Sequence, residues 1–168
     1  NIPVIAYNVP SRTGVNILPA TMERIADIPN IAGIKEASGN MQQVLETARR
    51  IRHKCDLYSG EDALNLPILC AGGKAVISVV SNVVPKQVKM LVSEVFDGKL
   101  DLANGTNDVL LPLINACFVE VNPIPVKAAM NLLGFDAGVP RAPLTPIEPA
   151  HLELLKNAIN ENYIEVHA

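Results

Sequence analysis

Short apolar runs alternate with segments of helical periodicity along the first part of the chain. Most of these runs are nearly continuous in apolar residues, which is typical of strands covered on both faces of a parallel sheet. Each run is followed by apolar residues at helical spacing, and strands that alternate with helices predict parallel βαβ units. The predicted strands are Ile2–Tyr7, Ile31–Glu36, Asp56–Ser59 and Ala75–Val80.

Residues that favour helix starts stand at the head of the helical segments. Pro19 suits the first turn of one helix, and Asn40 suits the N-cap of the next. The apolar stripe of that second helix comprises Met41, Val44, Leu45, Ala48 and Ile51. A short apolar helix is predicted over Ala63–Ala71, and Pro85 begins another helix.

The pattern after Gly98 is purely helical. Further helix candidates are Lys99–Cys117, Pro123–Leu133 and Pro149–Asn160. Pro112 is expected to kink or split the first of these, and the proline-rich stretch Gly134–Glu148 is predicted to be a loop. We therefore divide the chain into residues 1–98, which carry the βα units, and a helical extension over residues 99–168.

This order of elements predicts an α/β fold but leaves its architecture open. Successive βα units fit a small open sheet, and they equally fit half of a (β/α)8 barrel, which typically needs about 250 residues. In both cases the chemistry belongs at the carboxyl ends of the strands. The chain also begins Asn1-Ile2-Pro3-Val4 without a methionine, so we expect it to be cut from a longer protein.

Composition excludes several classes of function. Aromatic residues make up 4% of the chain and the formal charge is −3, which disfavours a nucleic-acid-binding surface. No apolar run approaches the length of a membrane helix. The cysteines, Cys55, Cys70 and Cys117, are odd in number and widely spaced, so we expect no zinc site, no disulfide framework and a cytoplasmic location. The histidines have no metal-ligand spacing, and Gly72-Gly73-Lys74 is not a phosphate-binding loop.

Lys35 is the most informative residue of the chain. It stands near the end of a strand that otherwise reads as buried, and burial lowers the pKa of an ammonium. A neutral amine at such a position can attack a carbonyl carbon and form a Schiff base. The alternative is a lysine that extends to solvent or pairs with Glu36, although adjacent strand residues point to opposite faces.

Tyr7 and Arg12 accompany Lys35 at the predicted carboxyl edge. Tyr7 ends the first strand, and its phenol can move protons during imine formation, although an ordinary half-buried tyrosine fits as well. Arg12 lies in the following loop, between Pro10 and Gly14, and can bind a carboxylate or stand in solvent.

Two longer segments carry a family resemblance. Tyr7–Gly14 and Gly33–Gly39 closely resemble the signature segments of the dihydrodipicolinate synthase family, pyruvate-dependent class I aldolases that are grouped with N-acetylneuraminate lyase. Shorter matches, in the same order as in the family, are Ser59–Asp62, Gly72–Ser78 and Asn122–Lys127. The resemblance implies a TIM-type (β/α)8 barrel, of which this chain would hold strands five to eight and the C-terminal helical extension.

The same resemblance implies the roles of individual residues. Lys35 would form a Schiff base with pyruvate, and Tyr7 would relay protons. Arg12 would bind the carboxylate of aspartate semialdehyde, and the backbone around Gly60 and Ile77 would line the pocket. The product, 4-hydroxy-tetrahydrodipicolinate, leads to diaminopimelate and lysine. The imine itself activates pyruvate, so no cofactor is implied, and the family suggests a homotetramer.

The resemblance also shows what the chain lacks. The family's Gly-Thr-Thr-Gly-Glu segment, which binds the pyruvate carboxylate, belongs to the first half of the barrel, so we expect the N-terminal half to be needed for activity. The arginine of Ser11-Arg12-Thr13 favours the synthase over the neuraminate lyases. An aldolase for a sugar-derived 2-keto acid and a non-catalytic half-barrel remain the alternatives.

Overall fold

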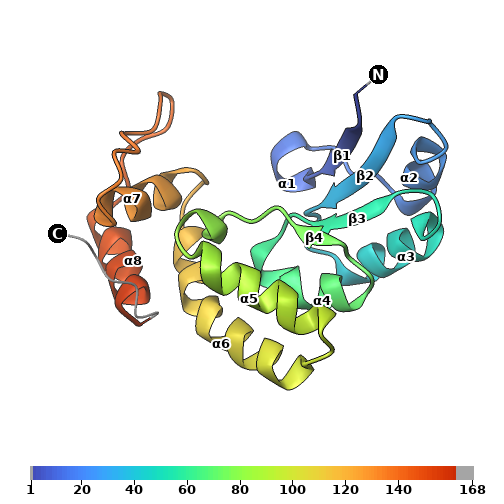
Figure 1. Ribbon diagram of the computed structural model, residues 1–168. Coiled ribbons are helices and arrows are strands. Elements are labelled where there is room, and N and C mark those ends of the chain that lie inside the picture. The colour runs from blue at the N-terminus through green and yellow to red at the C-terminus, as the bar shows by residue number, and fades with distance from the viewer. Residues whose placement is uncertain (1, 162–168) are drawn as a thin grey trace. The chain divides into compact units, whose positions relative to one another are not determined.

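A computed structural model describes residues 2–161 and contains a parallel sheet flanked by helices (Figure 1). Its strands are β1 (Val4–Asn8), β2 (Ile31–Glu36), β3 (Asp56–Ser59) and β4 (Ala75–Val76). They lie in the order β1-β2-β3-β4, and every neighbouring pair is parallel. The predicted α/β class and the parallel arrangement are therefore confirmed.

The predicted end of the fourth strand at Val80 is wrong. β4 stops at Val76, and a 3₁₀ turn occupies Val80–Asn82. The cause is the short partner strand: β3 ends at Ser59, whose carbonyl accepts the last hydrogen bond from the Ile77 amide at 2.7 Å. Beyond that bond β4 has no neighbouring strand on this side to continue the ladder.

The helices begin close to where the sequence signals predict. They are α1 (Pro10–Thr13), α2 (Pro19–Ile25), α3 (Met41–Ile51), α4 (Asn65–Cys70), α5 (Pro85–Phe96), α6 (Leu100–Cys117), α7 (Ile124–Leu132) and α8 (Pro149–Glu161). Asn40 caps α3, because its side-chain oxygen accepts a hydrogen bond from the Gln43 amide at 3.1 Å. Pro112 does not split α6. Proline has no amide hydrogen, so the Asp108 carbonyl loses its helical donor, but both residues are exposed.

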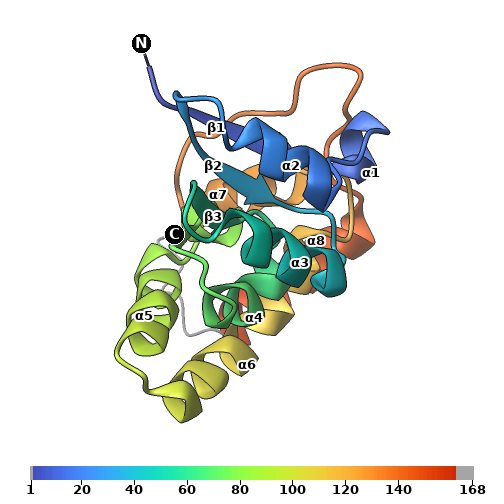
Figure 2. The same ribbon diagram turned by 90° about the vertical axis from the view of Figure 1, so that its right-hand side faces the viewer.

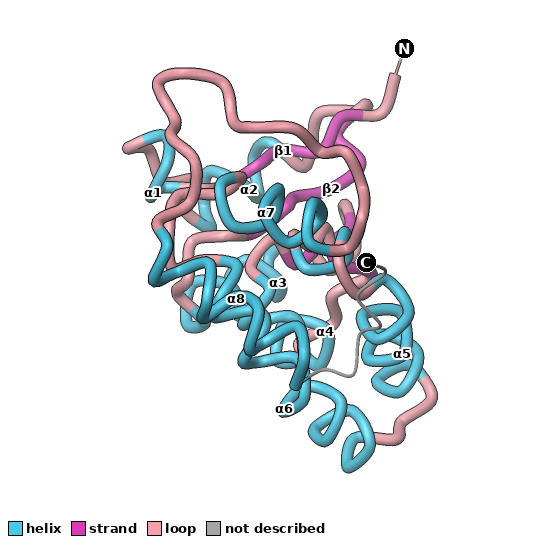
Figure 3. Tube along the Cα trace, turned by 90° about the vertical axis from the view of Figure 1, so that its left-hand side faces the viewer, coloured by secondary structure: helices cyan, strands magenta, loops and turns pink. Residues whose placement is uncertain are grey.

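Contacts divide the chain into two compact units, residues 1–78 and 79–168. The sequence pattern divides the chain after residue 98 instead, where the βα repeat ends, and that boundary stays a prediction. In the second unit α5 packs against α6, and α6 and α7 pack against α8. Figure 3 shows the segment between α7 and α8 as a long loop, as predicted for Gly134–Glu148. Within residues 2–161 no helix is long and apolar enough to cross a bilayer.

One face of the sheet in the first unit is covered by helices. Figure 2 shows α2 and α3 side by side against it. Ile34 and Leu57 of the sheet form a buried core there with Met22, Val44 and Ile68. Leu45, predicted to lie on the buried stripe of α3, is 53% exposed, because it is turned away from Val44 by one residue of helical rotation. Thr47 lies on the buried stripe in its place, so the buried residues of α3 are Val44, Thr47, Ala48 and Ile51.

The second face of the sheet is open in this chain. Ile5, Tyr7 and Ile77 are 43%, 48% and 40% exposed, although the continuous apolar pattern predicts cover on both faces. Lys35 and Tyr58 alternate with the buried residues Ile34 and Leu57, so they belong to this open face. Tyr7 and Lys35, two of the residues predicted to carry chemistry, thus lie on the face that the described part of the chain leaves uncovered.

Candidate active site

The parallel register aligns candidate residues in a row near the carboxyl edge of the sheet. Tyr7 pairs with Lys35, Lys35 pairs with Tyr58, and Tyr58 pairs with Ala75. Paired residues of neighbouring strands lie on the same face of a sheet. The row therefore runs across the open face, from β1 to β4.

Lys35 and Tyr7 are in direct contact. The Nζ atom of Lys35 lies over the Tyr7 ring, 4.1 Å from its centroid, within the range of a cation–π interaction. The prediction that the two side chains share one region is confirmed. The prediction that Lys35 is buried with its strand is wrong for this chain: Ile34 and Glu36 are buried on the helix-covered face, whereas Lys35 on the open face is partly exposed.

Gly60 borders the Lys35 side chain. A Cβ atom built at Gly60 would stand 2.7 Å from both Cγ and Cε of Lys35, closer than non-bonded carbons approach. The Gly60 amide donates to the Glu36 carbonyl at 2.8 Å, which extends the pairing of β2 and β3. Ile77, just after β4, continues the same edge, because its amide donates a hydrogen bond to the Ser59 carbonyl. The Lys35 side chain thus passes directly over the backbone at Gly60, where there is no side chain.

Arg12 stands apart from this row. It lies in α1, a single helical turn that begins at Pro10 and ends at Gly14, where φ is +69°. The sequence predicted that these two residues fix the path of a loop, and it did not predict the helical turn that the structure has between them. Thr13 holds the turn, since its hydroxyl lies 3.2 Å from the Val9 carbonyl and 3.0 Å from the Val15 carbonyl and can donate to either. The Arg12 side chain is exposed and has no ion pair or hydrogen bond within residues 2–161.

Sequence reasoning missed the buried polar pair behind the row. Asn8 and Glu36 are fully buried on the helix-covered face, and Asn8 Nδ2 donates to both carboxylate oxygens of Glu36, at 3.2 and 3.1 Å. The expectation that Lys35 and Glu36 do not pair is confirmed, because they point to opposite faces. The signal was available: a period of two places Asn8 and Glu36 among core residues, where a polar side chain needs a partner.

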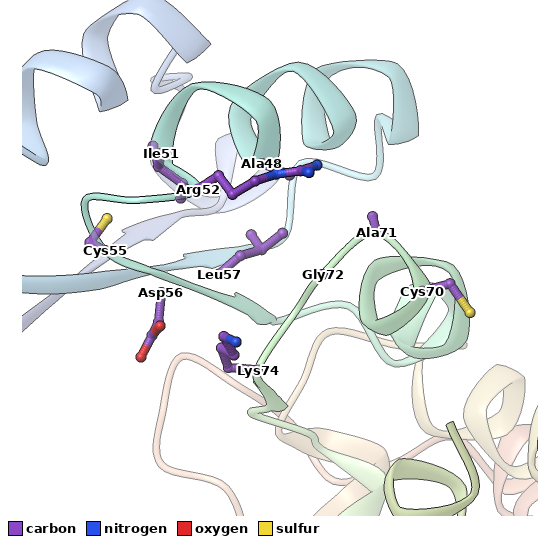
Figure 4. A pocket seen from close by; sticks show the side chains of 10 residues that line it. All are labelled: Ala48, Ile51, Arg52, Cys55, Asp56, Leu57, Cys70, Ala71, Gly72 and Lys74. Atoms are coloured by element: carbon purple, nitrogen blue, oxygen red, sulfur yellow. The ribbon is translucent and has the colours of Figure 1, made fainter. Parts of the chain in front are cut away.

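A separate pocket of about 340 Å3 lies at the opposite edge of the sheet (Figure 4). Its lining includes Asp56 at the start of β3, Lys74 before β4, and Cys55 and Cys70 from the connections. Active sites of barrel and open-sheet folds lie at the carboxyl edge, so this amino-edge pocket is not the candidate site. Burial raises the pKa of the Cys55 thiol, which disfavours its reactive thiolate.

Metal chemistry has no support in the described residues. Within residues 2–161 there is no group of three or more His, Cys, Asp or Glu side chains able to hold a metal ion. The three cysteines are free thiols. The groups predicted to carry chemistry at the carboxyl edge are an amine, a phenol and a guanidinium, on Lys35, Tyr7 and Arg12.

Comparison with known proteins matches nearly the whole chain. The model of the dihydrodipicolinate synthetase family matches residues 1–162. The 4-hydroxy-tetrahydrodipicolinate synthase of Caldicellulosiruptor bescii is 48% identical over 166 residues, which are 99% of this chain and 56% of that protein. The chain thus spans about half the length of the curated relatives it matches.

Solved structures show the same relationship. Dihydrodipicolinate synthase from Thermotoga maritima is 46% identical, with a TM-score of 0.90 over 96% of this chain and 56% of its own. The chloride-inhibited dihydrodipicolinate synthase from Acinetobacter baumannii, solved in complex with pyruvate, is 37% identical, with a TM-score of 0.92 over 96% of this chain and 56% of its own. The arrangement of strands and helices in this chain is therefore similar to about half of each of those folds.

Proposed function

Because the chain belongs to the dihydrodipicolinate synthetase family, we propose that it carries the Schiff-base lysine of a 4-hydroxy-tetrahydrodipicolinate synthase. The proposed reaction condenses pyruvate with L-aspartate 4-semialdehyde. The observation that carries the proposal is the position of Lys35 at the carboxyl edge of the sheet, with its amine over the ring of Tyr7. The activity for which the relatives are named and the pyruvate complex of the Acinetobacter baumannii protein support this choice of substrates.

The proposed chemistry begins at the Lys35 amine. Its unprotonated nitrogen attacks the carbonyl carbon of pyruvate, and loss of water from the carbinolamine leaves a protonated imine. The phenol of Tyr7, beside the amine, donates a proton to the departing oxygen and recovers it from solvent or substrate. A tyrosine held against the amine can act here without a large movement of either side chain.

The imine then activates the methyl group of pyruvate. The positively charged nitrogen withdraws electrons, the methyl carbon loses a proton, and the resulting enamine attacks the aldehyde carbon of the second substrate. That step forms the new carbon–carbon bond, and the aldehyde oxygen takes up a proton. Ring closure by the amino group of the second substrate displaces Lys35 and frees the enzyme. No cofactor enters this sequence.

Arg12 is the proposed anchor for the second substrate. Its guanidinium is exposed and without a partner in the described residues, so it is free to bind the carboxylate of aspartate semialdehyde in a bidentate manner. The backbone at Gly60 and Ile77 is proposed to line the pocket beside the imine, on the side of Lys35 away from β1. It can face the substrate closely because Gly60 has no side chain.

The remainder of the site is proposed to lie in a second half of the barrel. In this proposal the chain supplies strands five to eight of a TIM-type (β/α)8 barrel and the helical extension. The share of the relatives that it covers, 56%, and the exposed apolar face of the sheet support the proposal. The other half would bind the pyruvate carboxylate. A homotetramer and a cytoplasmic location accompany the proposal as family expectations.

The test is chemical trapping in the full-length protein. Borohydride added with pyruvate reduces the imine to a stable amine, and mass mapping should find one adduct, on Lys35. Lys74→Arg, at the opposite edge of the sheet, is the matched control and should leave the adduct unchanged. An adduct on another lysine would overturn the assignment of Lys35, and no adduct would favour the non-catalytic alternative. Turnover of a sugar-derived 2-keto acid in place of aspartate semialdehyde would favour the other aldolase.

A further inference from the structure

Asn8 and Glu36 connect the two strands that carry the proposed reactive side chains. Each follows its neighbour, Tyr7 or Lys35, directly in the sequence, and both are fully buried on the helix-covered face. Asn8 Nδ2 donates to Glu36 Oε1 at 3.2 Å and to Oε2 at 3.1 Å. The connection lies immediately behind the Tyr7–Lys35 contact, so any shift between the strands there would shift that contact as well.

The outer partners fix the orientation of both side chains. Asn8 Oδ1 accepts a hydrogen bond from the Ile17 amide at 2.9 Å, so its Nδ2 group must face Glu36. The same Nδ2 donates to Asn16 Oδ1 at 3.0 Å. On the other side the Ser38 amide donates to Glu36 Oε1 at 2.7 Å. Asn16 and Ile17 end the loop that carries Arg12, so the loop is bound to the same pair.

We infer that the hydrogen-bonded pair of Asn8 and Glu36 is a positioning device, which sets Lys35 against Tyr7 and holds the Arg12 loop at the carboxyl edge. The inference rests on the proposed function. Neither residue touches a substrate, because both point away from the open face. Burying a carboxylate is costly unless it is fully hydrogen-bonded, and here every described contact of Glu36's carboxylate is with a donor. With an asparagine at position 8 and a glutamate at position 36, only one arrangement of donors and acceptors satisfies both side chains.

That arrangement makes the exchange of single atoms informative. In Glu36→Gln the oxygen stays on the Ser38 amide and the new amide nitrogen takes the place of Oε2, 3.1 Å from Asn8 Nδ2, so two donors meet there and only the 3.2 Å bond to Oε1 remains. Asn8 cannot turn over, because Ile17 requires its oxygen. In the double variant Asn8→Asp with Glu36→Gln, the donor moves to position 36 and the acceptor to position 8. The Ile17 and Ser38 amides keep their acceptors, and the buried charge remains within the pair. Only the amides of exposed Asn16 and half-buried Gln43, which bond each other, must turn over, and Gln43 then gives up its long 3.4 Å bond to the Ile17 carbonyl.

The measurement is the rate of pyruvate trapping at Lys35 in the full-length protein. It is made at a temperature where circular dichroism shows every variant to be fully folded. Glu36→Gln should trap about tenfold to hundredfold more slowly, the loss expected from a misplaced reacting group. The double variant should recover to within about threefold of the unaltered protein. Thr47→Val is the control, because Thr47 Oγ1 is buried on α3 without a hydrogen-bond partner, and it should leave trapping unchanged.

The outcomes separate this inference from the proposed function. If the pair is purely structural, Glu36→Gln should have a lower melting temperature but trap pyruvate at the unaltered rate while folded. That result overturns the inference. A double variant that stays as slow as Glu36→Gln also overturns it. If Glu36→Gln does not fold, the exposed change Asn16→Ala, which removes one partner of Asn8, should still slow trapping several-fold; unchanged trapping there overturns the inference. Absence of any adduct in the unaltered protein overturns the proposed function itself.

Discussion

Gly60 lies so close to Lys35 that a methyl group at position 60 would stand 2.7 Å from both Cγ and Cε of the lysine. The path of the lysine side chain over the sheet therefore depends on a missing side chain on the neighbouring strand. Gly60 is not one of the glycines with positive φ, so alanine fits its backbone. The main conflict of a larger residue is with the lysine, and a smaller one is with the Ala37 Cβ atom at 3.2 Å.

Gly60→Ala should accordingly impair chemistry more than folding. Lys35 must leave its position over Tyr7, and we expect pyruvate trapping to fall at least about tenfold, because a reacting group is misplaced. Gly105→Ala is the matched control: its Cβ would meet nothing within 4 Å in α6, so it should leave trapping unchanged and stabilise the helix by about 0.5–1 kcal/mol. Stopped-flow trapping and thermal unfolding measure the two effects, and equal trapping by both variants would contradict the prediction.

Arg12→Ala should separate the binding of the two substrates. Because the guanidinium is exposed and makes no hydrogen bond or ion pair with a described residue, its loss should leave the fold and the pyruvate adduct intact. Loss of a charge-assisted contact to the second carboxylate should raise KM for aspartate semialdehyde, at a cost of about 2 kcal/mol or more in kcat/KM. Arg12→Lys keeps the charge without the planar guanidinium, so its kcat/KM for aspartate semialdehyde should fall between those of Arg12→Ala and the unaltered protein. Steady-state kinetics with each substrate varied measures the split, and a lost adduct would refute the assigned role.

The positions of the strands along the chain and their parallel arrangement could be predicted from the sequence, because both follow from local pattern, and Tyr7 then meets Lys35 because their strands are neighbours. Apolar runs fix which segments are strands, and parallel strands bring their carboxyl ends to one edge. The exposure of Leu45 and the early end of β4 could not, since they depend on which neighbour stands opposite. The hydrogen bond between Asn8 and Glu36 depends in the same way on a partner 28 residues away.

Glu46 provides a prediction on pH. Side-chain hydrogen bonds from Arg49, and then from Arg50, lower its pKa from 4.5 to about 2. A carboxyl whose pKa is lower in the folded state stabilises the fold above the unfolded pKa, and the contribution is lost as pH falls. The stability due to Glu46 should therefore decline between about pH 4.5 and pH 2.

A carboxyl titration by NMR checks this pKa directly. High salt should raise it, because the group is at the surface and its charges are screened. Glu46→Gln should remove this part of the pH dependence of unfolding, whereas Glu153→Gln, in an exposed pair with Lys156, should leave it in place. A Glu46 pKa near 4.5 at low salt would contradict the ion-pair geometry.

The last prediction concerns the 168-residue chain by itself. β1 lies at one end of the sheet, with no strand beyond it among residues 2–161, and the open face carries exposed apolar side chains such as Ile5 and Ile77. Unpaired strand edges and apolar faces of this kind are templates for association. We expect the isolated chain to self-associate and to lack synthase activity, and we expect a supplied N-terminal half to restore both a single species and the activity.

Two substitutions distinguish a face that needs its other half from general stickiness. Ile5→Lys places a charge on the open face, and Leu45→Lys places one on the solvent side of α3, where the leucine is 53% exposed against 43% for Ile5. In the isolated chain Ile5→Lys should reduce association, measured by sedimentation, and Leu45→Lys should change it little. In the full-length protein Ile5→Lys should be harmful instead. It should destabilise the fold by several kcal/mol, about the cost of an uncompensated buried charge, because the barrel interior would enclose the lysine. Leu45→Lys should be tolerated there. A monomeric isolated chain with synthase activity, or a full-length protein indifferent to Ile5→Lys, would refute the half-barrel proposal.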